Sequence, residues 1–142
     1  MINRHQFAGA IFALNALICL AVGLTFVFAS EFFPFHGDVI ETDWQALSVS
    51  YQTLYLGMMR TEGAGYLATA LAVFWLLAIP YRKGEYWSAW AIVTIALMEH
   101  LPTLLANLHV AQTTAAEPPW YFVMGCMISL CFGLVLVPRR SR

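Results

Sequence analysis

Residues 6–30 form a run of 25 residues without a single charged side chain. An α-helix crosses the core of a bilayer with about 20 apolar residues, so this run is long enough to span a membrane. Its hydrophobic part is also longer than the roughly 7–15 residues of a secretory signal, which favours a spanning helix over a cleaved leader. This one feature restricts the chain to membrane-embedded folds.

The composition agrees with that restriction. Of the 142 residues, 61% are hydrophobic and only 11% are charged, whereas a water-soluble domain carries about 25% charged residues. The net charge of −1 leaves no basic patch for the phosphates of a nucleic acid. We therefore expect the lipid bilayer as the main partner, and no nucleic acid.

Three further apolar segments have the length of spanning helices. They cover about 54–79, before Pro80, then 87–110, and finally 120–137, where Pro118 and Pro119 suit a helix start. A helix satisfies its own backbone hydrogen bonds, as lipid requires. With the first span at about 7–29, the sequence predicts an all-α, antiparallel up-down four-helix bundle. It would form one transmembrane domain, 1–142, with an outer loop at 30–53.

If the four spans alternate in direction, the basic and most of the acidic residues of the loops and chain ends fall on opposite sides of the membrane. One side receives six of the seven basic residues, namely Arg4, Arg82, Lys83, Arg139, Arg140 and Arg142. The other side receives only acidic residues, namely Glu31, Asp38, Glu41, Asp43 and Glu117. Because positive residues remain on the cytoplasmic side, both termini are predicted to be cytoplasmic. The expected location is the inner (plasma) membrane of a bacterium.

The outer loop contains a helix-start pattern. Thr42-Asp43-Trp44-Gln45 has the spacing of a capping box, and apolar residues then recur at helical intervals up to Leu54. Two outcomes are open. Either a short amphipathic helix lies on the outer surface, or the second span begins early and projects beyond the membrane.

Ionisable residues inside the spans are the strongest indication of function. A charge near the bilayer centre costs at least about 2.5–3.5 kcal/mol, so such residues usually face protein or a cavity. Here they are Arg60, Glu62, Glu99, His100 and His109. Counting about 1.5 Å per residue places Glu99 and His100 near mid-membrane, with Arg60, Glu62 and Asn107 in the outer half.

In the third span, Glu99, His100, Thr103 and Asn107 fall within an arc of about 100° on the helix. They predict one polar stripe, in which Glu99 and His100 are the candidate catalytic pair for proton transfer. The alternative is a hydrogen-bonded packing cluster in which Glu99 contacts Asn15, Ser129 or His100.

In the second span, Glu62 shares a side with Thr69 and Gly65, and Tyr66 lies at its edge. Arg60 points about 160° away from Glu62, so it would stand at the mouth of a site or reach outward to the loop acids. The predicted ligand-binding residues are Arg60, Glu62, Tyr66, Thr103 and Asn107. They would bind an anionic head group or carboxylate; alternatively, Arg60 and Glu62 only pair with the outer loop or with Asn107.

Other residues are expected to pack. A stripe of small side chains on the second span suits close helix contact, within the chain or between copies; it comprises Gly57, Thr61, Gly65, Ala68 and Ala72. Cys19, Cys126 and Cys131 are interpreted as small core residues. His36, Asp38 and Glu41, or an axial His100, were weighed as metal or haem ligands, but without zinc spacing no metal is expected. No cofactor is indicated.

These observations lead to one main hypothesis. The bundle binds a lipophilic or amphipathic small molecule in its outer half, as a possible proton-coupled enzyme or transporter. Two alternatives remain, an accessory subunit of a larger membrane complex and a homo-oligomeric channel or transporter.

Overall fold

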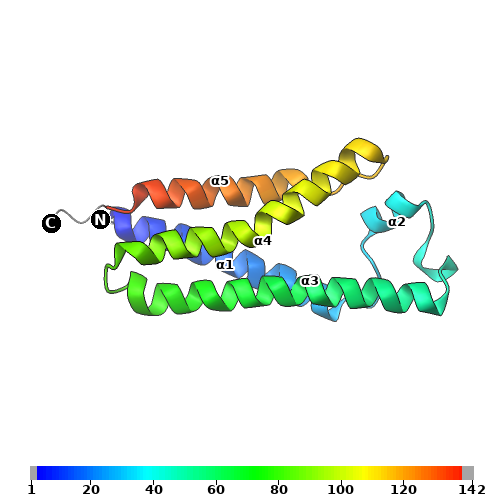
Figure 1. Cartoon of the computed structure of the whole chain (residues 1–142), viewed down its shortest axis with the longest axis horizontal. Helices are drawn as coiled ribbons and strands as arrows, with labels where there is room; N and C mark the ends of the chain where they lie inside the picture. Colours follow the sequence, from blue (N-terminus) through cyan, green and yellow to red (C-terminus); the bar gives the residue numbers. More distant parts are fainter. Residues whose placement is uncertain (1–2, 139–142) are drawn as a thin grey trace.

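A computed structural model describes residues 3–138, and within that range the chain is entirely helical, without a strand. The prediction of an all-α protein is confirmed. The α-helices are α1 (Arg4–Phe28), α2 (Pro34–Ile40), α3 (Val49–Leu76), α4 (Tyr86–Thr113) and α5 (Trp120–Leu136). A 3₁₀ turn covers Trp44–Ala46 and a π turn covers Leu77–Tyr81. Figure 1 shows α1, α3, α4 and α5 running alongside one another.

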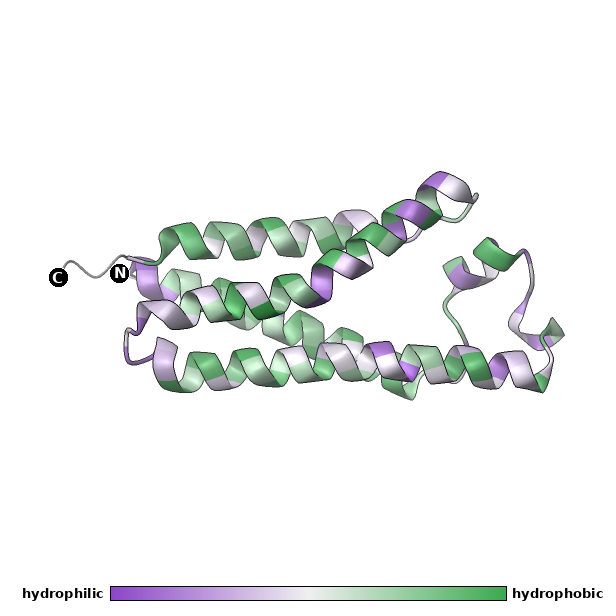
Figure 2. Ribbon diagram, viewed as in Figure 1, coloured by the Kyte–Doolittle hydropathy of each residue, from purple (hydrophilic) through white to green (hydrophobic). Residues whose placement is uncertain are grey.

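Three of these helices are long and apolar enough to cross a membrane: Arg4–Phe28, Val49–Tyr81 and Tyr86–Thr113. The fourth, α5, is apolar but has only 17 residues. Large apolar side chains remain exposed on all four, for example Leu14, Trp75, Met98 and Val135. Hydrophobic residues cover most of their length in Figure 2. The helices therefore have the composition of a membrane protein.

The start of α1, the end of α5 and the turn between α3 and α4 lie at the same end of the molecule (Figure 1). Asn3 caps α1 by accepting from the Gln6 backbone N–H at 2.8 Å, and the Gln6 side chain accepts in return from Asn3 N–H. The Tyr81 hydroxyl donates to the carbonyl of His5 at 2.8 Å, and the two rings stack. These contacts hold the start of α1 against the end of α3.

The sequence predicts that the second span ends before Pro80, but in the structure Pro80 lies within the helical segment that continues α3. Helical structure continues to Tyr81 as a π turn, in which Arg82 N–H donates to the carbonyl of Leu77. A wider turn tolerates a residue that has no N–H to donate. The chain then reverses through Gly84, whose φ of +76° is a conformation that favours glycine.

The closest helix contact joins α1 to α3 through Gly23 and Gly63. A Cβ at Gly63 would stand 2.8 Å from the Gly23 carbonyl oxygen and 2.9 Å from Phe26 Cβ. Gly63 does not belong to the small-residue stripe predicted from the sequence, which begins with Gly57 and Thr61. Part of that stripe makes no helix contact. Gly57 has no atom within 4 Å of its Cβ position, and Thr61 is exposed.

The main core lies in the half of the molecule near the chain ends, where α1, α4 and α5 meet α3. Phe12, Ile92 and Leu130 are fully buried there. Next to this core, Asn15 on α1 donates to the Ser129 hydroxyl on α5 at 3.0 Å. This bond gives Asn15 and Ser129 a structural role that does not involve Glu99.

Helix α4 contains Pro102, and the helix visibly changes direction near its middle (Figure 1). Proline removes one backbone hydrogen bond and crowds the preceding turn, which is a common cause of such a bend. Beyond Pro102, α4 diverges from α3. The two helices are therefore farther apart in the half of the molecule away from the turn that joins them.

The segment between α1 and α3 combines both outcomes expected for it. A short helix forms, but it is α2 at Pro34–Ile40 and not at the predicted capping box, and α3 also begins early, at Val49. Asp43 starts only the 3₁₀ turn, and its side chain makes no capping hydrogen bond. The α2 helix folds back toward the space opened by the bend in α4 (Figure 1).

Candidate functional site

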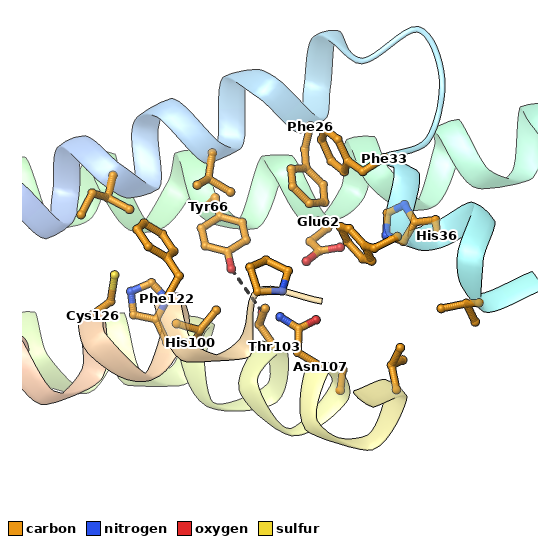
Figure 3. Close-up of a pocket in the computed structure, with 18 of the residues that line it drawn as sticks. Phe26, Phe33, His36, Glu62, Tyr66, His100, Thr103, Asn107, Phe122 and Cys126 are labelled. Atoms are coloured by element: carbon orange, nitrogen blue, oxygen red, sulfur yellow. Dashed lines mark hydrogen bonds between the residues drawn. The ribbon is translucent and has the colours of Figure 1, made fainter. Parts of the chain in front are cut away.

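A cavity of about 480 Å³ occupies the space beyond the bend in α4. All five α-helices contribute side chains to its wall, and Figure 3 shows it from within. Most of the wall is apolar: Ile18, Val22 and Phe26 come from α1, and Phe122 and Val123 come from α5. Apolar cavities of roughly 300–1,000 Å³ with a few polar groups are typical small-molecule sites.

Polar groups gather at the end of the cavity next to α2. The Glu62 carboxylate on α3 and the Asn107 amide on α4 point inward from opposite sides (Figure 3). His36 on α2 lines the same end, and its buried Nδ1 has no hydrogen-bond partner among residues 3–138. The Glu62 carboxylate and the Asn107 amide are thus directed toward a bound molecule, and the imidazole of His36 borders the same end.

His100 lies at the opposite, deeper end. It is only 2% exposed, and its Nε2 lies 3.9 Å from the Cys19 sulfur. Its Nδ1 is buried and has no partner within the described part of the chain. A buried polar atom without a partner is costly, so this nitrogen is an unsatisfied polar group in a residue of the cavity wall.

Tyr66 and Thr103 line the cavity between its two ends. The Tyr66 hydroxyl donates to Thr103 Oγ at 3.4 Å, a long bond that joins α3 to α4. Thr103 in turn donates to the carbonyl of Glu99 at 3.2 Å, one turn earlier on its own helix. Five of the residues singled out from the sequence thus line one cavity, namely Glu62, Tyr66, His100, Thr103 and Asn107.

Glu99 does not line this cavity, although it precedes His100. Its carboxylate lies against Gly65 of α3, where an added Cβ would stand 3.1 Å from Oε2, and it accepts a hydrogen bond from Thr69. It faces a separate open groove along α3, which Glu62 also borders. Glu99 and His100 therefore line different depressions, and their action as a proton-transfer pair stays a prediction.

Arg60 is also absent from the cavity wall. Its side chain is exposed, and it forms no ion pair with the loop acids Asp38, Glu41 or Asp43 within the described residues. Among the residues that the structure describes, no Lys or Arg lines the cavity. The geometry thus removes the cation on which recognition of an anionic head group depended.

Sequence reasoning missed the contribution of α2. Phe33, Phe35 and His36 line the cavity, but His36 had been considered only as a possible metal ligand. The available signal was the run Phe32-Phe33-Pro34-Phe35-His36, which is too aromatic for a loop in water. A second missed signal was Pro102, since a proline within an apolar helix predicts a bend.

The cysteines fall into two groups. Cys19 and Cys126 are buried, and Cys126 lines the cavity, whereas Cys131 is exposed on α5, so its interpretation as a core residue was wrong. Across residues 3–138, no three His, Cys, Asp or Glu side chains are placed to hold a metal ion.

Burial lowers the pKa of His36 from its ordinary value of 6.5. In an opened α2 segment the imidazole regains that ordinary pKa and binds protons more readily, so acidification favours opening. We expect the protection of α2 amides against hydrogen exchange, corrected for intrinsic rates, to fall between pH 7 and pH 5. The same measurement on His36→Gln should show no comparable loss. Equal loss in both proteins would contradict the assignment to His36.

Comparison with known proteins adds no functional information. No protein family, curated protein or solved structure matches this chain. Its function has to be argued from the cavity itself.

Proposed function

We propose that this protein binds a lipophilic or amphipathic small molecule within the membrane. The observation that carries the proposal is the 480 Å³ cavity, whose largely apolar wall includes the polar side chains of Glu62 and Asn107 and the buried His100, the Nδ1 of which has no partner within residues 3–138. A molecule with an apolar body and hydrogen-bonding groups would satisfy these atoms and fill space that is otherwise costly.

The proposal includes a membrane topology. The chain forms a four-helix bundle, with α5 as the fourth span and both termini on the cytoplasmic side of a bacterial inner membrane. In its support, the start of α1 and the turn between α3 and α4 lie at one end of the molecule, and these segments contain Arg4, Arg82 and Lys83; α2 lies toward the other end, with acidic residues in and next to it. Arg139, Arg140 and Arg142, which complete the charge pattern, lie outside the described residues. The cavity would then open in the outer half of the bilayer.

Filling the cavity tests the proposal. Ala106 lines it, so Ala106→Phe would place a ring inside; Val22→Phe does the same from α1. We expect native mass spectrometry of the purified protein to show a bound small molecule that both substitutions remove. Ala21→Phe is the matched control, because Ala21 is exposed on α1 and does not line the cavity. An adduct that persists in both filled variants would refute binding at this site.

A second candidate function is that of an accessory subunit or homo-oligomer. The open groove along α3, bordered by Gly57, Thr61 and Gly65, favours it, because small residues allow a further helix to approach closely. In that case a cysteine introduced by Gly57→Cys should cross-link to a neighbouring protein in native membranes. Gly125→Cys on α5 is the control and should not cross-link, although Gly125 is also exposed.

A further inference from the structure

Among the described residues, the α2 end of the cavity carries an acidic side chain but no Lys or Arg. Glu62 is the acidic residue of the wall, and within residues 3–138 no Lys or Arg lines the cavity to neutralise it. A second acid, Glu99, lies on the groove that Glu62 also borders. The nearest basic residue in sequence, Arg60, is exposed and does not line the cavity. An anionic head group would therefore meet repulsion here, whereas a cation would meet a carboxylate that has no Lys or Arg neighbour in the cavity wall among the described residues.

Aromatic rings enclose the same end. Phe26 of α1 and Phe33 have centroids 4.8 Å apart, and Phe33 stacks with Phe35 at 6.2 Å. The Phe35 and His36 centroids are only 4.1 Å apart. Figure 3 shows the rings of Phe26 and Phe33 and the Glu62 carboxylate gathered at this end. Aromatic faces attract organic ammonium groups, and this attraction grows when water is excluded.

From these two observations we infer that the cavity selects an amphipathic organic cation, such as an amine or quaternary ammonium compound. The cationic head lies between Glu62 and the aromatic rings of α1 and α2, and the apolar body extends along Val22 and Phe122 toward His100. This inference rests on the proposed function, since it names the class of ligand for the same cavity.

The test compares three probes that share one apolar chain. The cation is octyltrimethylammonium, the neutral isostere is 2,2-dimethyldecane, in which carbon replaces nitrogen, and the anion is octanesulfonate. Binding of each labelled probe to the protein in lipid nanodiscs is measured by equilibrium dialysis, with empty nanodiscs subtracted. We expect the cation to bind about tenfold or more tightly than its isostere, and the anion not to bind measurably.

Variants assign the preference to its residue. Glu62→Gln should remove the advantage of the cation, and Glu62→Asp, which keeps the charge, should retain most of it. Arg60→Gln is the control, because it alters charge on the same helix but outside the cavity. Ala106→Phe should prevent binding of every probe.

The outcomes separate this inference from the proposed function. Equal binding of cation and isostere, both prevented by Ala106→Phe, would overturn cation selection while leaving a ligand site in place. Preferred binding of the anion, or an undiminished cation advantage in Glu62→Gln, would overturn the inference as well. If none of the three probes bound more tightly to the original protein than to the Ala106→Phe variant, both proposals would be overturned.

Discussion

Gly63→Ala is expected to destabilise the protein by about 1–3 kcal/mol, the usual cost of an added group in a close-packed contact. The new methyl group would stand 2.8 Å from the Gly23 carbonyl oxygen and 2.9 Å from Val27 Cγ2. A backbone oxygen cannot rotate away as a flexible side chain can, so α1 and α3 must separate. The free energy of unfolding can be measured by titrating the purified protein with dodecyl sulfate in mixed micelles and following far-UV circular dichroism.

Gly57→Ala is the matched control on the same helix. Its Cβ has no atom within 4 Å, and alanine is favoured over glycine inside a helix by up to about 1 kcal/mol. The control should therefore be as stable as the original protein or slightly more stable. If both variants lost stability equally, the close approach of α1 and α3 at Gly63 would be refuted.

The sequence predicted the helices well because their signal is local. A run such as 6–30, without charge, has to be buried in lipid or protein, and its length follows from the thickness of a bilayer. The helix observed there is Arg4–Phe28, close to the expected 7–29. The boundaries were less accurate near Pro80 and Val49, where a π turn and an early helix start depend on contacts with other segments.

The candidate site was only partly predictable because rotation on one helix does not decide which neighbour a side chain meets. An arc of about 100° on α4 is wide enough to cover two interfaces. Glu99 faces Gly65 and the groove along α3, whereas His100, Thr103 and Asn107 face the cavity. The other missing part was α2, whose ring contacts join it to residues outside the helix, such as Phe33 to Phe26 of α1, and no local sequence pattern gives such contacts.

Phe12→Ala is expected to be at least as disruptive as Gly63→Ala, with a loss of about 3 kcal/mol in the same unfolding measurement. Phe12 is fully buried, its ring edge meets Tyr81 at a centroid distance of 5.7 Å, and it fills the space beside Gly133. Lipid is as apolar as phenylalanine, so burial in itself contributes little within a bilayer. The loss arises instead from van der Waals contacts that no neighbouring atom can replace.

The matched control is Phe132→Ala on α5, where the side chain is 53% exposed. If that surface faces lipid tails, they close over the shortened residue, and the change in stability should stay within about 0.5 kcal/mol. Comparable losses at both positions would mean that the Phe132 surface is also covered by protein. Because α5 is the short helix among the four, that result would favour a partner packed along it and a role within a larger complex.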